Sequence, residues 1–205
     1  VQREDTAVPS ISLNKADSVT TSNSAPFSIQ ATIDGFPDFD CLEMDESTGE
    51  HIITYEWELV SGPASLSNTF QNDSALFFLE AYSMNPGGTY QFQVTGTVAF
   101  AATTQYSNSR MVDVITIAQT PVVFLSPGSG TRSTLSDLHF TAEESYDPDY
   151  PVDDPSRTSL TYSFHCNIVD SNEICTFTTI NAYTATFDSA NAIANVMYEF
   201  TVTVV

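Results

Sequence analysis

The chain has 205 residues, and its 26 acidic side chains against 5 basic ones give a formal net charge of -21 at pH 7. This charge excludes nucleic-acid binding, because phosphate backbones are bound by clustered Lys and Arg. Hydrophobic residues make up 41% of the chain, enough for one large or two small cores, but no apolar run reaches the ~20 residues that cross a bilayer, so we expect no direct membrane insertion.

The first half of the chain alternates apolar and polar residues in short segments. Apolar side chains occupy every second position of residues 27–33, of residues 53–59 and of residues 90–94. A period of two is typical of a half-buried antiparallel strand, with one face on a core and the other in water. A last strand of this half is expected over residues 111–117.

The second half repeats the order of the first. Residues 8–13, 27–31, 53–57 and 90–94 have counterparts at residues 120–125, 138–142, 160–164 and 198–202. The offsets of about 107 to 112 positions indicate a duplicated unit of roughly 110 residues, the size of an immunoglobulin-like sandwich. The sequence therefore predicts an all-β fold of two tandem immunoglobulin-like antiparallel β-sandwiches, residues 1–118 and 119–205. The second sandwich is expected to lack its last strand, because the counterpart of residues 111–117 would fall after Val205.

Four aromatic residues are expected to anchor the two cores. Trp57 and its counterpart Phe164 each lie in a predicted strand, where an aromatic side chain buries on the order of 150–250 Å². Tyr90 and Tyr198 stand two residues before a phenylalanine. This is the spacing of a tyrosine corner, in which the tyrosine hydroxyl bonds to the backbone a few residues upstream.

Three segments carry motifs of a known kind of module. They are Tyr-Glu-Trp-Glu-Leu-Val-Ser-Gly-Pro at 55–63, Asn-Pro-Gly-Gly-Thr-Tyr-Gln-Phe-Gln-Val at 85–94, and Ser-Tyr-Asp-Pro-Asp at 145–149 followed by Leu-Thr-Tyr-Ser-Phe-His-Cys at 160–166. Together they resemble the PKD and REJ (receptor for egg jelly) modules of polycystin-like ectodomains, although Phe164 stands where the REJ pattern has tryptophan. The resemblance implies modules strung in arrays on secreted, surface or ciliary proteins, with adhesive, spacing or mechanical roles. It does not imply a reaction.

Two acidic loops occupy equivalent places in the two halves and are candidate calcium sites, because calcium takes several oxygen ligands. In the second loop the candidate ligands are Asp147, Asp149, Asp153 and Asp154. In the first, the acidic residues are Asp34, Asp38, Asp40, Glu43, Asp45 and Glu46. Neither loop has EF-hand spacing, so a solvated acidic loop without metal is the alternative, and no other cofactor is expected.

The cysteines indicate whether the chain resides in an oxidising or a reducing compartment of the cell. Cys166 and Cys175 flank a polar stretch that could turn between two strands, and we expect a disulfide between them. Such a bond indicates an oxidising compartment, with buried reduced thiols as the alternative. Cys41 has no evident partner in the sequence, and Asn72 heads a candidate glycosylation triplet, Asn-Asp-Ser.

The sequence does not indicate an enzyme. Its three histidines, His51, His139 and His165, occupy unrelated positions, and no Gly-x-Ser-x-Gly motif occurs. We expect a non-enzymatic structural or adhesive array on an extracellular, cell-surface, ciliary or filament protein, with other protein chains or neighbouring domains as partners. The alternatives are a calcium-dependent or carbohydrate-binding module and an accessory domain of a secreted enzyme.

Overall fold

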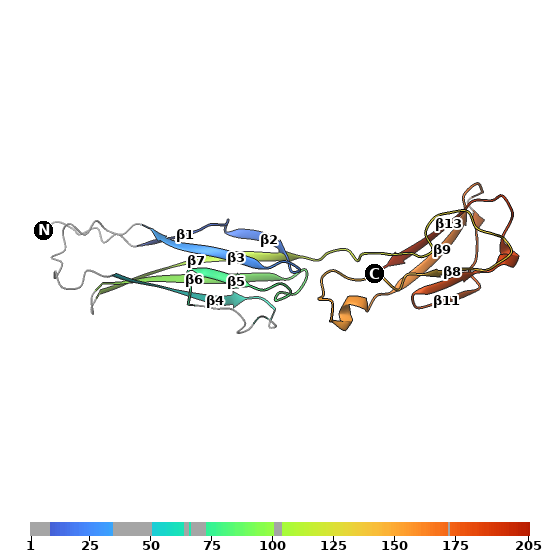
Figure 1. Cartoon of the computed structure of the whole chain (residues 1–205). Helices are drawn as coiled ribbons and strands as arrows, with labels where there is room; N and C mark the ends of the chain where they lie inside the picture. Colours follow the sequence, from blue (N-terminus) through green and yellow to red (C-terminus); the bar gives the residue numbers. More distant parts are fainter. Residues whose placement is uncertain (1–8, 35–50, 64–65, 67–72, 101–103, 172) are drawn as a thin grey trace. The chain divides into compact units, whose positions relative to one another are not determined.

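The regular elements of the computed structural model are β-strands and short 3-10 helices (Figure 1). The structure describes residues 9–34, 51–63, 66, 73–100, 104–171 and 173–205. The chain divides into two compact units, Val1–Ala118 and Gln119–Val205, and each has a hydrophobic core of its own. The prediction of an all-β fold is confirmed.

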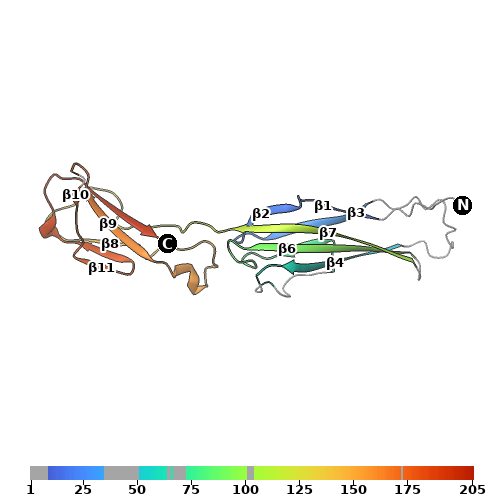
Figure 2. The ribbon, with the colours of Figure 1, turned by 180° about the vertical axis from the view of Figure 1, so that it is seen from behind.

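The first unit contains two sheets. Its strands are β1 (Ser10–Leu13), β2 (Ser18–Ser22), β3 (Phe27–Asp34), β4 (His51–Ser61), β5 (Leu76–Leu79), β6 (Thr89–Phe100) and β7 (Thr104–Ile117). One sheet has the order β1-β3-β5 and the other the order β2-β7-β6-β4. Figure 2 shows the second of these sheets, with β6 between β4 and β7. All neighbouring strands are antiparallel except β2 and β7, which are parallel.

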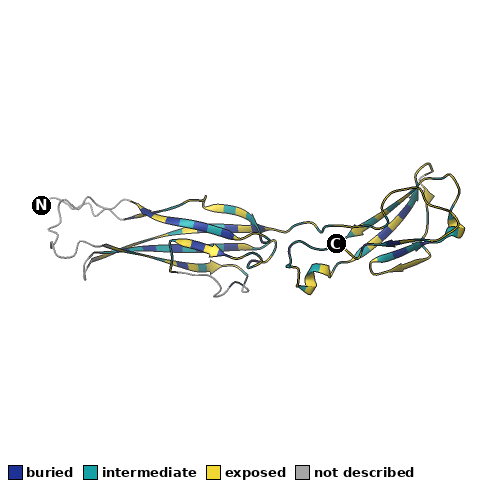
Figure 3. Cartoon of the chain, in the orientation of Figure 1, coloured by how far each residue is buried: buried dark blue, intermediate teal, exposed yellow. Residues whose placement is uncertain are grey.

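Side-chain alternation builds the first core between these two sheets. Along β3, Phe27 and every second residue after it are buried, and β6 shows the same alternation (Figure 3). The ring of Phe77 on β5 lies 4.9 Å from that of Trp57 on β4 and 4.7 Å from that of Phe92 on β6. The two sheets are thus joined face to face through aromatic contacts.

The second unit also contains two sheets. Its strands are β8 (Leu138–Thr141), β9 (Tyr162–Ile168), β10 (Glu173–Ile174), β11 (Thr179–Asn181), β12 (Thr184–Phe187) and β13 (Tyr198–Val204). The sheet orders are β11-β12-β8 and β10-β9-β13, and all pairs are antiparallel. The loop before β9 contains a 3-10 helix, Pro155–Thr158.

The second core is a smaller aromatic cluster. Phe140 on β8 and Phe187 on β12 lie with ring centroids 4.5 Å and 5.3 Å from that of Phe200 on β13. Phe177 contacts Phe200 and the buried Phe164 on β9, with centroid distances of 5.9 Å and 6.1 Å. Edge-to-face and tilted pairs at these separations are favourable for aromatic rings.

Candidate functional site

A tyrosine corner closes one end of the first unit. The Tyr90 hydroxyl accepts a hydrogen bond from the backbone N–H of Asn85, five residues upstream, at 2.6 Å, and the Tyr90 side chain is fully buried. A Cβ atom at Gly62 or Gly88 would lie only 2.7 Å or 2.9 Å from the Tyr90 ring, so both positions require glycine. Gly87, three residues before Tyr90, has a left-handed φ of 69°.

The second unit contains the same corner. The Tyr198 hydroxyl accepts a hydrogen bond from the backbone N–H of Ile193, again five residues upstream, at 2.8 Å. Asn195, three residues before Tyr198, has φ of 63°, so an asparagine takes the left-handed place that Gly87 fills in the first unit. The two turns are therefore built alike from different residues.

The central strand pairs also share one register. Trp57 on β4 is opposite Val94 on β6, and Phe164 on β9 is opposite Val202 on β13. Trp57 is 2% exposed and Phe164 is 8% exposed. The indole N–H of Trp57 also donates to the backbone oxygen of Ser74 at 2.9 Å, which satisfies its buried polar group.

The acidic loop of the second unit uses its carboxylates for hydrogen bonds. Asp147 accepts from the backbone N–H of Asp149 at 2.9 Å. The buried Asp149 carboxylate accepts from the backbone N–H of Gln119 at 2.7 Å and from the Gln119 amide at 3.3 Å. Asp154 caps the helix Pro155–Thr158, because its Oδ1 accepts from the backbone N–H of Ser156 at 2.8 Å.

The half-buried Arg157 links separate segments of this loop. Its guanidinium donates to the backbone oxygen of Tyr150 at 2.6 Å and lies 4.1 Å from the centroid of the Tyr146 ring. Its backbone oxygen accepts from the N–H of Asp147 at 2.8 Å. The loop is thus held by its own residues, and Tyr146 in turn stacks with Phe124 at 6.4 Å.

The four candidate calcium ligands do not converge. In the part of the chain that the structure describes, no three His, Cys, Asp or Glu side chains are grouped closely enough to hold a metal ion. Asp153 is exposed, whereas Asp147, Asp149 and Asp154 serve the hydrogen bonds given above. Of the first acidic loop only Asp34 is described, and it accepts from the Ser12 hydroxyl at 2.7 Å; the rest of that loop lies outside the described residues.

Cys166 and Cys175 form a disulfide, with their Cα atoms 5.1 Å apart. Cys166 is buried on β9 and its backbone oxygen accepts from the N–H of Cys175 at 3.0 Å. A bond of this kind is typical of an oxidising compartment. Cys41 and the glycosylation candidate Asn72 lie outside the described residues.

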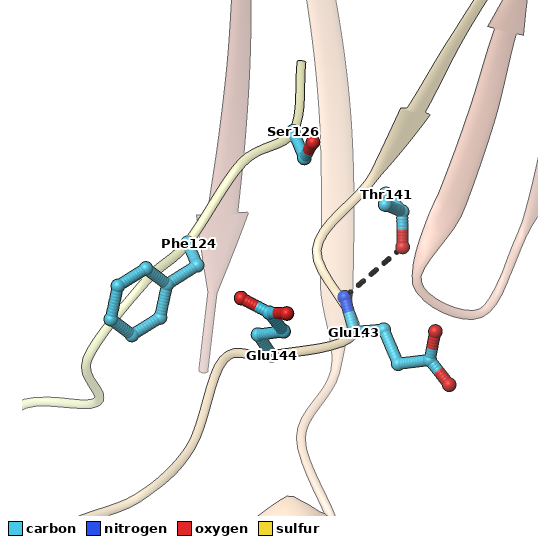
Figure 4. Close-up of a pocket in the computed structure, with 5 residues that line it drawn as sticks. All are labelled: Phe124, Ser126, Thr141, Glu143 and Glu144. Carbon is cyan, nitrogen blue, oxygen red and sulfur yellow. Dashed lines mark hydrogen bonds between the residues drawn. The ribbon is translucent and has the colours of Figure 1, made fainter. Parts of the chain in front are cut away.

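A small hollow of about 160 Å³ lies beside β8, the first strand of the second unit (Figure 4). It is lined by Phe124, Ser126, Thr141, Glu143 and Glu144. The backbone N–H of Glu143 donates to the Thr141 hydroxyl at 3.3 Å, and Figure 4 shows the Glu143 carboxylate pointing away from Phe124. The volume is below the roughly 300–1,000 Å³ of small-molecule pockets, so the hollow does not define a ligand site.

Two titratable groups of the second unit have shifted pKa values. The pKa of Asp137 is lowered because its carboxylate accepts hydrogen bonds from the backbone N–H, at 2.9 Å, and the side chain of Ser189. The pKa of Tyr162 is raised, first by burial of its phenol and second by the nearby Tyr183. Both shifts have structural causes in packing and hydrogen bonding.

The sequence analysis did not predict the helix cap at Asp154, although the Asp-Pro pair at residues 154–155 indicates one. Asp154 directly precedes Pro155, and an acidic residue followed by proline is typical of a cap and the first position of a helix. The two tyrosine corners, by contrast, lie at the residues that their spacing indicates.

The cores, the tyrosine corners and the disulfide together define a class of protein. Strand-built units with aromatic cores, one of them with a disulfide, are typical of modules from the outside of cells. Within the described residues, no helix is long and apolar enough to cross a bilayer.

The comparison with protein families then identifies the module. The REJ domain matches residues 41–205, and the chain belongs to the REJ domain family, as its motifs indicate. The REJ domain is a non-catalytic extracellular module. A comparison with curated protein sequences finds no match.

Proposed function

We propose that the chain is a structural and adhesive segment of an extracellular or cell-surface protein, made of two tandem immunoglobulin-like modules of the PKD/REJ kind. The observation that carries the proposal is the repeated strand pair with its tyrosine corner: Trp57 opposite Val94 in one unit and Phe164 opposite Val202 in the other. A tyrosine corner next to a central buried aromatic is a hallmark of immunoglobulin-like sandwiches. Tandem modules of this design act as spacers whose strand edges and loops contact other chains.

The charge of the chain supports the same role. A net charge of -21 repels other copies of the chain and anionic surfaces, and it favours basic partners. Partners of the proposed array are other protein chains or neighbouring domains of the same protein. The proposed location is the surface of a cell, a cilium or an extracellular filament.

Mechanical unfolding of single molecules tests the modular part of the proposal. When the chain is pulled from its two ends, we expect two separate cooperative steps, one for each unit. Reduction of the Cys166–Cys175 bond should lengthen only the step of the second unit, by roughly 25 Å. The nine-residue separation becomes extensible to about 31 Å, at about 3.4 Å per residue, and the bonded Cα atoms already span 5.1 Å of it. A gradual extension without steps would contradict the proposal.

Cross-linking in the native setting tests the adhesive part. Photoreactive groups at exposed positions such as Ile52, Val60 and Leu135 should yield adducts with other chains. Recovery of uncross-linked monomers alone, from intact cells or filaments, would contradict an array function.

The alternatives, a calcium-dependent or carbohydrate-binding module and an accessory domain of a secreted enzyme, have less support. In the second acidic loop, the carboxylates of Asp149 and Asp154 already accept hydrogen bonds from backbone N–H groups, and a calcium ion would have to replace these bonds. Titration calorimetry with calcium would revive this alternative if it showed saturable heat together with a higher melting temperature at millimolar calcium. An accessory role beside a secreted enzyme gains no specific support from the described residues.

A further inference from the structure

The second unit contains a long exposed loop before its first strand. Residues 128–137 form no helix or strand, and each of them is exposed. Leu135 within this loop is 91% exposed, and a Cβ atom at Gly128 would meet no other atom within 4 Å. Exposed loops of small and polar residues are preferred sites of proteolytic cleavage. The loop therefore has the accessibility that a protease requires.

The hydrogen bonds of this loop stay within it. Among the described residues, the guanidinium of Arg132 donates to the backbone oxygens of Gly128, at 3.1 Å, and Thr131, at 3.3 Å. The backbone N–H of Leu135 donates to the Ser133 hydroxyl at 3.1 Å. None of these bonds joins the loop to a strand.

The loop is fastened at its two ends. On one side Ser126 and Thr141 exchange two backbone hydrogen bonds, of 2.9 Å and 2.7 Å. On the other side the Asp137 carboxylate accepts from the backbone N–H of Ser189 at 2.9 Å. A protease can therefore draw residues 128–136 into its active site while both fastenings and every strand pairing stay in place.

The charges around the loop favour one of the basic residues of the chain. Arg132 is the only charged residue between Asp113 and Asp137. Every other basic residue has an acidic residue within three positions: Arg3 has Glu4, Lys15 has Asp17, Arg110 has Asp113, and Arg157 has Asp154. A trypsin-like protease binds the basic residue before the cleaved bond through a carboxylate in its specificity pocket. Acidic neighbours repel that carboxylate, so Arg132 is the basic residue that fits such a pocket best.

The other basic residues in the described part of the chain are held by folded elements. Lys15 lies 5.6 Å from the centroid of the Phe27 ring, in the short turn between β1 and β2. Arg110 lies within β7, and its guanidinium is 2.6 Å from the Asp17 carboxylate. Arg157 belongs to the 3-10 helix before β9. Cleavage beside these residues requires local unfolding, whereas cleavage beside Arg132 does not.

A cut in the loop would leave contacts that join the two sides of it. All six strands of the second unit follow Ser133, whereas residues 119–126 precede it and bond to residues 141–149. Val122 and Tyr146 exchange two backbone hydrogen bonds, of 2.8 Å and 3.0 Å. Further hydrogen bonds between the two segments join Gln119 to Asp149, Phe124 to Ser145 and Ser126 to Thr141. These contacts do not depend on an unbroken loop.

We propose that the peptide bond between Arg132 and Ser133 is a processing site for a trypsin-like serine protease, and that the two resulting pieces stay associated through residues 119–126 and 141–149. The serine of the protease attacks the Arg132 carbonyl carbon, and the Ser133 amine leaves with a proton. Water then hydrolyses the acyl-enzyme and releases the Arg132 carboxylate. Cleavage thereby replaces the covalent link between β7 and β8 by hydrogen bonds and side-chain contacts. The inference goes beyond the proposed array function, because it requires neither two-step unfolding nor a cross-linked partner.

Limited proteolysis of the whole 205-residue chain with trypsin tests the site. Intact-mass measurement should find the pieces 1–132 and 133–205, formed at least about tenfold faster than any cut at the basic residues of folded elements. Arg132→Gln should abolish this cut and Arg132→Lys should retain it, because trypsin accepts either basic side chain. Lys15→Gln, at another exposed basic position, is the matched control and should leave the cut unchanged. Faster cleavage at any other basic residue from Lys15 onward would overturn the assignment.

Gel filtration of the cut chain tests the association of the pieces. In buffer the two pieces should elute together, and in concentrated urea they should separate, because only non-covalent contacts join them. Separate elution in buffer would overturn the second half of the proposal.

Labelling of N-terminal amines tests the processing itself, on the protein at its native surface. A new N-terminus at Ser133 should be found, and an inhibitor of trypsin-like serine proteases should reduce its amount. Absence of this N-terminus, or an amount that the inhibitor does not change, would overturn the proposal even if the chain behaves as a two-module array.

Discussion

The two units of the chain reach a folded state with different amounts of buried apolar surface. In the described residues, the first core holds sixteen buried hydrophobic residues, whereas the second holds six. In the first unit, Trp57 of the four-stranded sheet packs against Phe77 of the three-stranded sheet. The second unit has two three-stranded sheets. The second unit adds a covalent bond, Cys166–Cys175, within its smaller core.

This difference shows that two units with a similar central strand pair draw on different sources of stability. Small cores gain most from a cross-link, because they bury little surface on folding. Both units keep the tyrosine corner and the register of the central strand pair. These few contacts recur in both units, while the number of buried side chains differs.

The largest expected effect is a loss of stability that is confined to the first unit when its central aromatic residue is removed. Trp57→Ala should destabilise the first unit by about 3–5 kcal/mol, because it removes a 2% exposed side chain and leaves a cavity against Phe77. Urea unfolding followed by far-ultraviolet circular dichroism should show one transition moved to lower urea and the other unmoved. Val60→Ala, at an exposed position of the same strand, is the control and should have little effect.

Loss of the disulfide should act on the other unit. The double variant Cys166→Ala and Cys175→Ala should lower the stability of the second unit by about 2–3 kcal/mol, since the bond closes a short loop. Differential scanning calorimetry of the variant, and of the original protein under reducing conditions, should agree. A shift in the transition of the first unit would show that the two units do not unfold separately.

The tyrosine corners give a matched pair of variants. Tyr90→Phe removes the acceptor of the Asn85 N–H beside a fully buried ring, and should cost about 1–2 kcal/mol. Tyr198→Phe should cost below about 1 kcal/mol, because that side chain is half-buried and water can replace its hydroxyl. Chemical denaturation of both variants measures the difference, and equal costs would mean that burial does not set the strength of the corner.

Much of the strand plan can be predicted from residue alternation, and its exceptions have physical reasons. The segments 27–33 and 90–94 lie within β3 and β6, because polar and apolar residues there alternate with the pleat. β5 has no such alternation: Phe77 and Leu79 are buried, but Leu76 and Phe78 between them are also apolar although 46% exposed. The parallel pairing of β2 with β7 joins distant segments, which local patterns do not specify.

The candidate sites were predictable to a lesser degree. The cysteine spacing indicates the Cys166–Cys175 bond, because both residues belong to one hairpin. The roles of Asp149 and Asp154 depend on which N–H groups the loop turns towards them, and a list of acidic residues does not contain that information.

The cap at Asp154 predicts a smaller effect within that loop. Asp154→Ala should destabilise the second unit by about 0.5–1 kcal/mol, because the N–H of Ser156 loses its acceptor. Asp153→Ala, at the exposed neighbour, is the control for the loss of one negative charge. Thermal melts should separate the two variants, and identical melting temperatures would argue against the cap.

The smallest effect is a dependence on pH. Because the pKa of Asp137 is lowered in the folded chain, its hydrogen bonds to Ser189 stabilise the second unit above the ordinary aspartate pKa. This contribution is lost as the pH falls through the lowered folded value. Asp137→Asn should therefore flatten the stability of the second unit across the acid range, in melts recorded between neutral pH and about pH 2. An unchanged profile would contradict this role of Asp137.

The Cys166–Cys175 bond has a further consequence for how strands find their partners. β10 has only two residues, so its own side chains specify its register on β9 weakly. A shift of the register by one residue would turn the Ile174 side chain to the opposite face of the sheet. Covalent closure beside it leaves one alignment, with Glu173 opposite Ile168 and Ile174 opposite Asn167. Oxidation of two thiols thereby selects a single pairing out of several that the backbone alone would accept.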